Sequence, residues 1–207
     1  MRFILFFLLI IFFFNTSFAQ KYERITSPSS VKKSIQVKHQ NTKTLSSDFT
    51  EEVHSSMFNT PQNGNGTLFF KQTDKIRWEN SSSKQLILIN GDKVKLYDNG
   101  KSSGNPMANK LVKKIQGMML SMLSGDFLNE KEFTIAYFEN GKNYKLILTP
   151  KNARMSKYIS KIELYFNQKN LLLTEMILHE SNDQKMIYTF TNTKTNQPIN
   201  DTKFNQR

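Results

Sequence analysis

Cysteine is absent from this chain of 207 residues. Its absence excludes disulfide bridges, thiolate nucleophiles, zinc–cysteine sites, iron–sulfur clusters and lipid attachment to this chain through an N-terminal cysteine. Histidine occurs three times, and neither HExxH nor GxSxG is present. His179, which is followed by Glu180, is better explained as a residue at the solvated end of a strand than as a catalytic base. We therefore predict no catalytic residue, no cofactor and no enzymatic activity.

Acidic residues are also few, with 17 Asp and Glu against 29 Lys and Arg, which gives a net charge of +12. A positive charge of this size can serve nucleic-acid binding, but here the lysines are scattered along the chain. The aromatic residues alternate toward the inside of the predicted sheet and do not alternate with basic residues. We therefore expect no nucleic-acid partner. Solubility, anionic lipid surfaces or acidic protein partners explain the positive charge better.

The first 19 residues contain the one long apolar run. Arg2 precedes twelve consecutive apolar residues at 3–14, and Ser17 and Ala19 lie at positions −3 and −1 of a cleavage site before Gln20. This three-part pattern is typical of a secretory signal peptide. A membrane anchor is the alternative, but a spanning helix needs roughly 20 apolar residues. We predict a cleaved signal peptide at 1–19 and a single exported domain at 20–207.

In the remaining chain, alternation with a period of two predicts about nine strands, preceded by a short helix at 29–40. Asn90-Gly91 and Asn140-Gly141 are strong hairpin signals. Residues 59–66 are predicted to form a turn, and a polar tail begins at about residue 192. Short connections favour an antiparallel meander, and a sheet of nine or more twisted strands tends to curl.

One segment, 106–124, has helical spacing instead. It begins after Asn105 and ends before Gly125, and its apolar residues recur at steps of three and four. The thioethers of Met118, Met119 and Met122 are soft ligands that could hold copper. We favour an apolar face that adapts to variable apolar ligands, and predict no metal site. The sequence thus predicts an α+β fold that is mainly β: a curved antiparallel sheet with a helical lid over an apolar pocket.

Residues 66–97 resemble the family of the periplasmic lipoprotein carrier LolA. The matching positions are a strand-leading glycine, a strand lysine, an apolar residue and a tryptophan, then a hairpin and a tyrosine: Gly66, Lys71, Ile76, Trp78, Asn90, Gly91 and Tyr97. The segments FTEEV at 49–53 and YKLILTPK at 144–151 also resemble the family, and IQGMMLSMLSGD at 115–126 is similar to its Bacteroidota-type branch. The resemblance covers roughly residues 30–204.

The resemblance implies an unclosed antiparallel β-barrel with a helical lid over an apolar cavity, in a monomer located in the periplasm. It implies a carrier that shields the acyl chains of lipoproteins between the inner and the outer membrane. The implied partners are acylated lipoproteins, an inner-membrane transporter complex that loads the carrier, and the outer membrane or an acceptor lipoprotein that unloads it.

One position departs from the family pattern. Better-known members have an arginine directly after the strand lysine, and this arginine helps to latch the lid. Here the position is Gln72, which cannot form the charge-assisted hydrogen bonds of an arginine. Arg77 is a poor substitute, because alternation directs it away from Trp78. The lid is therefore held differently, or the client and its release differ.

The predicted lipid-binding residues follow from the resemblance and from the apolar faces of the strands and the helix. They are Phe49, Leu68, Phe70, Ile76, Trp78, Leu86, Leu88, Leu96, Ile115, Met118, Met119 and Met122. Two other functions stay open. One is a carrier of a different amphiphile, such as a lipid-linked pigment or a glycolipid precursor. The other is a structural or lipid-sensing module that is not an enzyme.

Overall fold

The computed structural model describes residues 21–72, 74–91, 93–102, 121 and 125–205. Within them, twelve strands form one sheet. The strands are β1 Glu23–Arg24, β2 Thr44–His54, β3 Gln62–Lys71, β4 Lys75–Asn80, β5 Gln85–Asn90, β6 Lys93–Asp98, β7 Lys101–Ser102, β8 Phe133–Glu139, β9 Asn143–Pro150, β10 Ile159–Asn167, β11 Leu173–Glu180 and β12 Lys185–Thr195. The predicted signal peptide and, apart from position 121, the predicted lid helix lie outside the described residues. No helix in the described part of the chain has the length and apolarity to cross a membrane.

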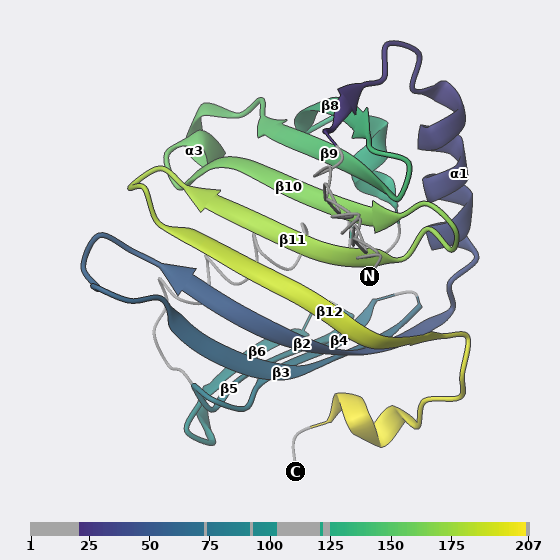
Figure 1. The fold of residues 1–207 in the computed structure, drawn as a ribbon. Helices are drawn as coiled ribbons and strands as arrows, with labels where there is room; N and C mark the ends of the chain where they lie inside the picture. Colours follow the sequence, from purple (N-terminus) through teal and green to yellow (C-terminus); the bar gives the residue numbers. More distant parts are fainter. Residues whose placement is uncertain (1–20, 73, 92, 103–120, 122–124, 206–207) are drawn as a thin grey trace, which may run out of the picture.

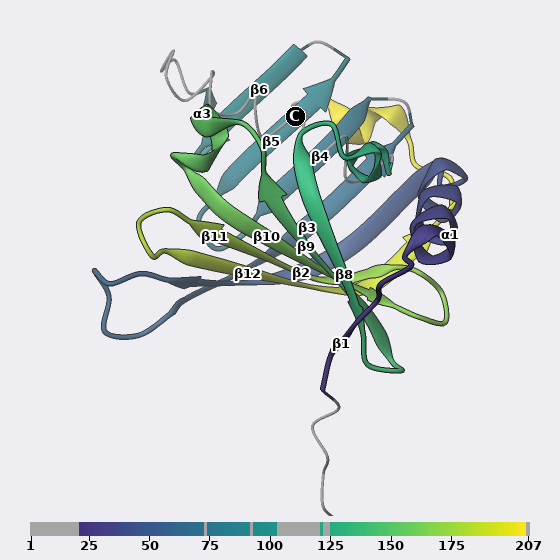
Figure 2. The same cartoon turned by 90° about the horizontal axis from the view of Figure 1, so that it is seen from above.

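The strand order across the sheet is β1-β8-β9-β10-β11-β12-β2-β3-β4-β5-β6-β7, and all the pairs are antiparallel. Most neighbours are consecutive in the chain, as a meander requires. The exceptions are β1, which pairs with β8, and β12, which lies between β11 and β2. Figures 1 and 2 show that the sheet bends strongly, so that β4, β5 and β6 turn back toward β8 and β9. The edge strands β1 and β7 do not pair, and the prediction of a curved, unclosed antiparallel barrel is confirmed.

Helix α1, Ser29–Gln40, forms where the sequence predicts it and lies at one end of the curved sheet (Figure 1). Its Ile35 is fully buried, and Val31 packs at the edge of the same cluster. The 3₁₀ helix η1, Asp126–Asn129, contacts α1 and buries Phe127. The short helix α3, Ala153–Ser156, lies at the opposite end of the molecule. Burial of the apolar stripe of α1 thus fixes the helix against one end of the sheet.

We call the side of the sheet that carries Phe49 and Trp78 the inner face, and the opposite side the outer face. The inner face carries two core clusters. The first lies between α1, η1 and β8–β10 and contains Ile35, Phe127, Leu128, Phe133, Tyr137, Leu146, Leu148, Ile162, Leu164 and Phe166. The second lies on β2–β5 and β12 and contains Phe49, Leu68, Phe70, Ile76, Ile89 and Phe190.

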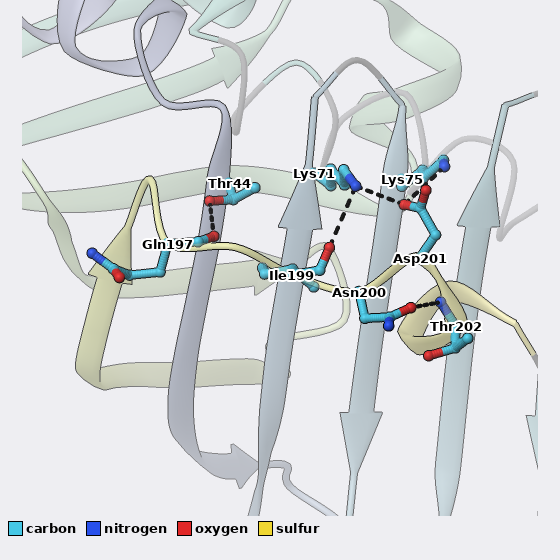
Figure 3. A network of polar contacts seen from close by, with 8 residues as sticks. All are labelled: Thr44, Lys71, Lys75, Gln197, Ile199, Asn200, Asp201 and Thr202. Atoms are coloured by element: carbon cyan, nitrogen blue, oxygen red, sulfur yellow. Dashed lines mark hydrogen bonds and ion pairs between the residues drawn. The ribbon is translucent and has the colours of Figure 1, made fainter.

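The C-terminal residues, which the sequence predicts as a polar tail, cross the outer face of β2–β5. Lys71 Nζ and Lys75 Nζ lie 2.8 and 3.1 Å from the carboxylate of Asp201 (Figure 3). The 3₁₀ helix η2, Asp201–Phe204, then buries Phe204, which is 2% exposed. The Arg77 guanidinium donates a hydrogen bond to the Lys203 carbonyl. A local reading missed this segment because its partners are more than 120 residues away in sequence.

The predicted turn at 59–66 and the predicted start of the tail at 192 are both displaced. Strand β3 already begins at Gln62, and β12 continues to Thr195. Two glycines, Gly64 and Gly66, interrupt the side-chain alternation of β3, although both pair with β2. In β12 a register shift between Thr191 and Lys194 disrupts the pattern. Alternation therefore fails where a side chain is missing or a bulge occurs.

A network of charges lies on the outer face of β9–β11. Glu163 is 5% exposed, and its carboxylate lies 2.6 Å from Lys145 Nζ, 2.8 Å from Lys161 Nζ and 3.0 Å from His179 Nε2. The Tyr165 hydroxyl donates a further hydrogen bond of 2.8 Å. Burial opposes ionisation of Glu163, but the hydrogen bonds from Lys145, Lys161 and Tyr165 prevail and lower its pKa from 4.5 to about 2.

Candidate functional site

The inner face of β2, β4 and β12 carries a group of four aromatic rings. The rings of Phe49 and Trp78 are 4.6 Å apart between centroids, with an interplanar angle of 32°. Tyr188 meets Trp78 edge to face at 5.2 Å, and Phe190 meets it at 6.1 Å. Phe49 and Phe190 are buried, whereas Trp78 is half-buried. These four rings form a large apolar surface on the inner face.

Gly66 makes this aromatic packing possible. It pairs with Phe49 on β2, so a side chain at position 66 would point to the inner face beside the ring. A Cβ atom there would lie 2.4 Å from Cζ of Phe49 and 2.0 Å from the carbonyl oxygen of Glu79. The second contact is with the backbone and cannot be relieved by a rotamer change. The strand-leading glycine of the family pattern therefore has a steric cause in this chain.

The strand register places six predicted lining residues on the inner face: Phe49, Leu68, Phe70, Ile76, Trp78 and Leu96. The two predicted residues of β5 are corrected. Leu86 pairs with Glu79, and Leu88 pairs with Arg77, so both lie on the outer face. The predicted helical residues Ile115, Met118, Met119 and Met122 lie outside the described residues.

The error in β5 has a simple cause. Every residue from 86 to 89 is apolar, so alternation cannot decide which pair faces inward. The inner pair is Ile87 and Ile89, which face Trp78 and Ile76. Leu88 is nevertheless buried, because η2 contacts β4 and β5 and lies on the outer face. Ile87 is therefore an inner-face residue that the sequence analysis did not include.

A small cavity lies between the C-terminal end of α1 and the inner face. Its volume is about 40 Å³. Its walls on the helix side include Lys38 and His39 of α1 and Thr42, two residues after the helix ends. On the sheet side they include Leu45, Ser47, Leu68, Leu164, Phe166, Leu172, Leu173, Phe190 and Thr193. The cavity joins the two core clusters, since its lining draws residues from both.

Gln72, the position that departs from the family arginine, contacts the end of α1. Its side-chain Nε2 donates a 3.3 Å hydrogen bond to the Gln40 carbonyl, and its backbone N–H donates to the Lys43 carbonyl at 2.8 Å. Gln72 therefore ties the turn after β3 to the last turn of α1 without a charge. Arg77 lies on the outer face, as alternation predicts, and forms an ion pair of 2.7 Å with Glu79.

A polar group interrupts the apolar inner face, and the sequence reading did not include it. Glu51 lies on the inner face together with Phe49. It pairs with Tyr188 of β12 on one side and with Gly64 of β3 on the other. The Nδ2 atom of Asn80 donates a hydrogen bond to Glu51 Oε2. The alternation of Phe49, Glu51 and Val53 contained the signal, because it places the carboxylate on the apolar side of the strand.

Within the described part of the chain, no group of three or more His, Asp or Glu side chains has the arrangement of a metal site. The inner face of the described strands is largely apolar, and beside the aromatic rings it carries the Glu51 carboxylate, the Asn80 amide and the Tyr188 hydroxyl.

Comparison with known proteins identifies the family. Residues 40–207 match the family described as outer membrane lipoprotein carrier protein LolA. This chain belongs to the LolA family. An outer-membrane lipoprotein carrier protein of Coxiella burnetii is 28% identical over 166 residues, which is 79% of this chain and 76% of the relative. The match leaves the first 39 residues outside the family region.

Solved structures that align with this chain are less similar to it in sequence. A LolA superfamily protein from Nitrosomonas europaea aligns with a TM-score of 0.46 at 11% identity, over 84% of this chain and 97% of that chain. A DUF1329 family protein from Desulfovibrio piger aligns with a TM-score of 0.47 at 11% identity, over 87% of this chain and 98% of that chain. The assignment to the LolA family rests on the sequence match alone.

Proposed function

We propose that this chain is a periplasmic carrier that holds the acyl chains of lipoproteins against its inner face and moves them from the inner to the outer membrane. The observation that carries the proposal is the broad apolar inner face of a LolA-family sheet, on which a half-buried Trp78 lies among three other aromatic rings. Such rings offer large contact area without specific bonds, which suits acyl chains of variable length.

The partners follow from the same proposal. An inner-membrane transporter complex loads the carrier, and the outer membrane or an acceptor lipoprotein unloads it. The protein acts as a monomer, without a cofactor and without catalysing a reaction. Residues 1–19 direct it to the periplasm and are cleaved.

The energetics require incomplete burial of the ligand. Two acyl chains with roughly 30 methylene groups, at about 0.8 kcal/mol each, would yield about 24 kcal/mol if fully buried. The free energy of non-covalent binding does not exceed about 18–21 kcal/mol in practice, and a carrier must also release its ligand. The cavity beside α1, of about 40 Å³, is far below the roughly 300–1,000 Å³ of ligand pockets. Acyl chains can enter there only if the surrounding elements move, and that movement offsets part of the binding energy.

A pair of charge substitutions tests the inner-face assignment. Trp78→Lys places a cation on the inner face, and Leu86→Lys places the same charge on the outer face of the neighbouring strand. Binding of a fluorescent fatty-acyl probe to the purified proteins should be abolished in Trp78→Lys and kept in Leu86→Lys. Circular dichroism checks that both variants are folded. Equal binding by both variants would show that the acyl chains do not bind at the inner face.

The client is identified by mass spectrometry of organic extracts from protein purified from its native periplasm. Co-purifying acylated lipoproteins support the proposal. Free lipids or pigment precursors would instead indicate a carrier of another amphiphile. An extract without lipids, from a protein that also takes up no apolar dye, would indicate a structural module with a packed core.

A further inference from the structure

The polar group on the inner face has a fixed geometry. Asn80 is 6% exposed, and its Oδ1 accepts hydrogen bonds of 3.0 Å from the backbone N–H groups of Ser82 and Ser83. These bonds determine which end of the amide is oxygen, so Nδ2 is the end that donates to Glu51. The amide therefore holds the carboxylate in one position on the inner face, next to the aromatic rings.

Two further residues complete the surroundings of this carboxylate. A Cβ atom at Gly64 would lie 3.0 Å from Glu51 Oε2, so the glycine provides room for the carboxylate over β3. Tyr188 faces Glu51 across the strand pair. Burial, and then the Glu51 charge, raise the pKa of Tyr188, so its hydroxyl stays neutral. Asn80 and Tyr188 thus flank the Glu51 carboxylate with neutral hydrogen-bonding groups.

No cation neutralises this charge within the described residues, because Glu51 has no ion pair with a Lys, Arg or His side chain there. The pairing register of the strands also shows on which face their basic residues lie. In strands β2–β6 and β8–β12, every Lys and Arg occupies a position on the outer face. Although the whole chain has a charge of +12, these strands therefore place carboxylates, Glu51 among them, and no Lys or Arg at inner positions.

We propose that Glu51, held by Asn80 beside Tyr188, is a head-group site that accepts the N–H donors at the acylated end of a polypeptide and disfavours anionic amphiphiles. This inference rests on the proposed carrier function and specifies its ligand. The acyl chains contact the aromatic rings, and the amide N–H groups and any ammonium group next to them donate to the carboxylate. A phosphate or a free fatty-acid carboxylate at the same place would be repelled by Glu51 and would find no cation on these strands.

The chain offers a matched control at the neighbouring position. Glu52 lies on the outer face, so Glu51→Gln and Glu52→Gln remove the same charge on opposite sides of β2. The two ligands are a diacylglyceryl-cysteine lipopeptide with a neutral peptide and phosphatidylglycerol with the same acyl chains. Each displaces a neutral apolar dye from the purified protein, and the ratio of their affinities measures head-group preference.

The wild type and Glu52→Gln should prefer the lipopeptide by about tenfold, as expected for a hydrogen bond to a charged group. Glu51→Gln should reduce the ratio to nearly one. If Glu51→Gln does not fold, Val53→Lys serves instead, because it puts a cation at the next inner position and should also raise affinity for phosphatidylglycerol. An unchanged ratio in the folded Glu51 or Val53 variant would overturn the head-group site. Failure of both ligands to displace the dye from any protein would instead refute the carrier function itself.

Discussion

Replacing Glu163 by glutamine should lower the free energy of unfolding by about 3 kcal/mol at pH 7. The magnitude follows from the pKa of Glu163, which is about 2 in the folded chain against an ordinary value of 4.5. A tenfold difference in proton affinity corresponds to about 1.4 kcal/mol, and glutamine keeps the shape of the side chain without its charge. The carboxylate is 5% exposed, so solvent screens little of this energy.

The pH dependence gives the same prediction a second test. The folded pKa of Glu163 is lower than the unfolded one, so its stabilisation is complete above pH 4.5 and is lost as the pH falls toward 2. The difference between wild type and Glu163→Gln should therefore shrink from about 3 kcal/mol at pH 7 to about 1.4 kcal/mol at pH 3. Binding of acyl chains at pH 7 should be unchanged, because Glu163 lies on the outer face.

Urea unfolding followed by tryptophan fluorescence at pH 7, 5 and 3 measures these differences, with Trp78 as the only tryptophan. Glu52→Gln is the control, since its ion pair with His54 is exposed and should contribute less than about 1 kcal/mol. A difference for Glu163→Gln that stays constant between pH 7 and pH 3 would refute the assignment of its stability to ionisation. A difference below about 1 kcal/mol at pH 7 would refute the magnitude.

Three further changes have defined outcomes. Gly66→Ala should destabilise the fold by about 2–3 kcal/mol in urea unfolding, because its methyl group would overlap a backbone carbonyl. Gly64→Ala, whose methyl group would meet only side-chain atoms at 3.0 Å or more, should cost less than about 1 kcal/mol, and similar values for the two variants would contradict the steric argument. Phe204→Ala should cost about 3–5 kcal/mol, and a cost below about 1 kcal/mol would show that η2 does not stabilise the sheet. Phe58→Ser, at the tip of the β2–β3 hairpin, should weaken binding to anionic vesicles severalfold in a sedimentation assay. Val37→Ser on α1, where the side chain is 44% exposed, should leave this binding unchanged. An equal loss in both variants would rule out contact through the hairpin.

The sequence predicted the parts of the fold that depend on local rules. Helix 29–40 and the turns at Gly91 and Gly141, with φ of 61° and 76°, formed where periodicity and hairpin signals placed them. Alternation also placed Trp78 and Arg77 on opposite faces. These features depend on neighbouring residues, so one stretch of sequence contains the information.

The features that the sequence did not predict depend on distant contacts. Phe204 is buried against the outer face of strands that lie more than 100 residues earlier in the sequence. The mainly polar composition of residues 192–207 gives no sign of this burial. The inner position of Ile87 in place of Leu86 depends on register, because the whole strand is apolar. The role of Glu51 became visible only when Asn80, 29 positions later, was found to hold its carboxylate.

The position of β12 has a consequence for how the chain acquires its fold. This strand is the sole link within the described sheet between β8–β11 and β2–β7, yet it is the last strand in the sequence. A chain that emerges N-terminus first therefore exposes two open strand edges, on β11 and on β2, until residues 185–195 have appeared. Partner strands could add to either edge until β12 pairs with both β11 and β2. The two half-sheets become one continuous sheet without open inner edges only when this strand joins them.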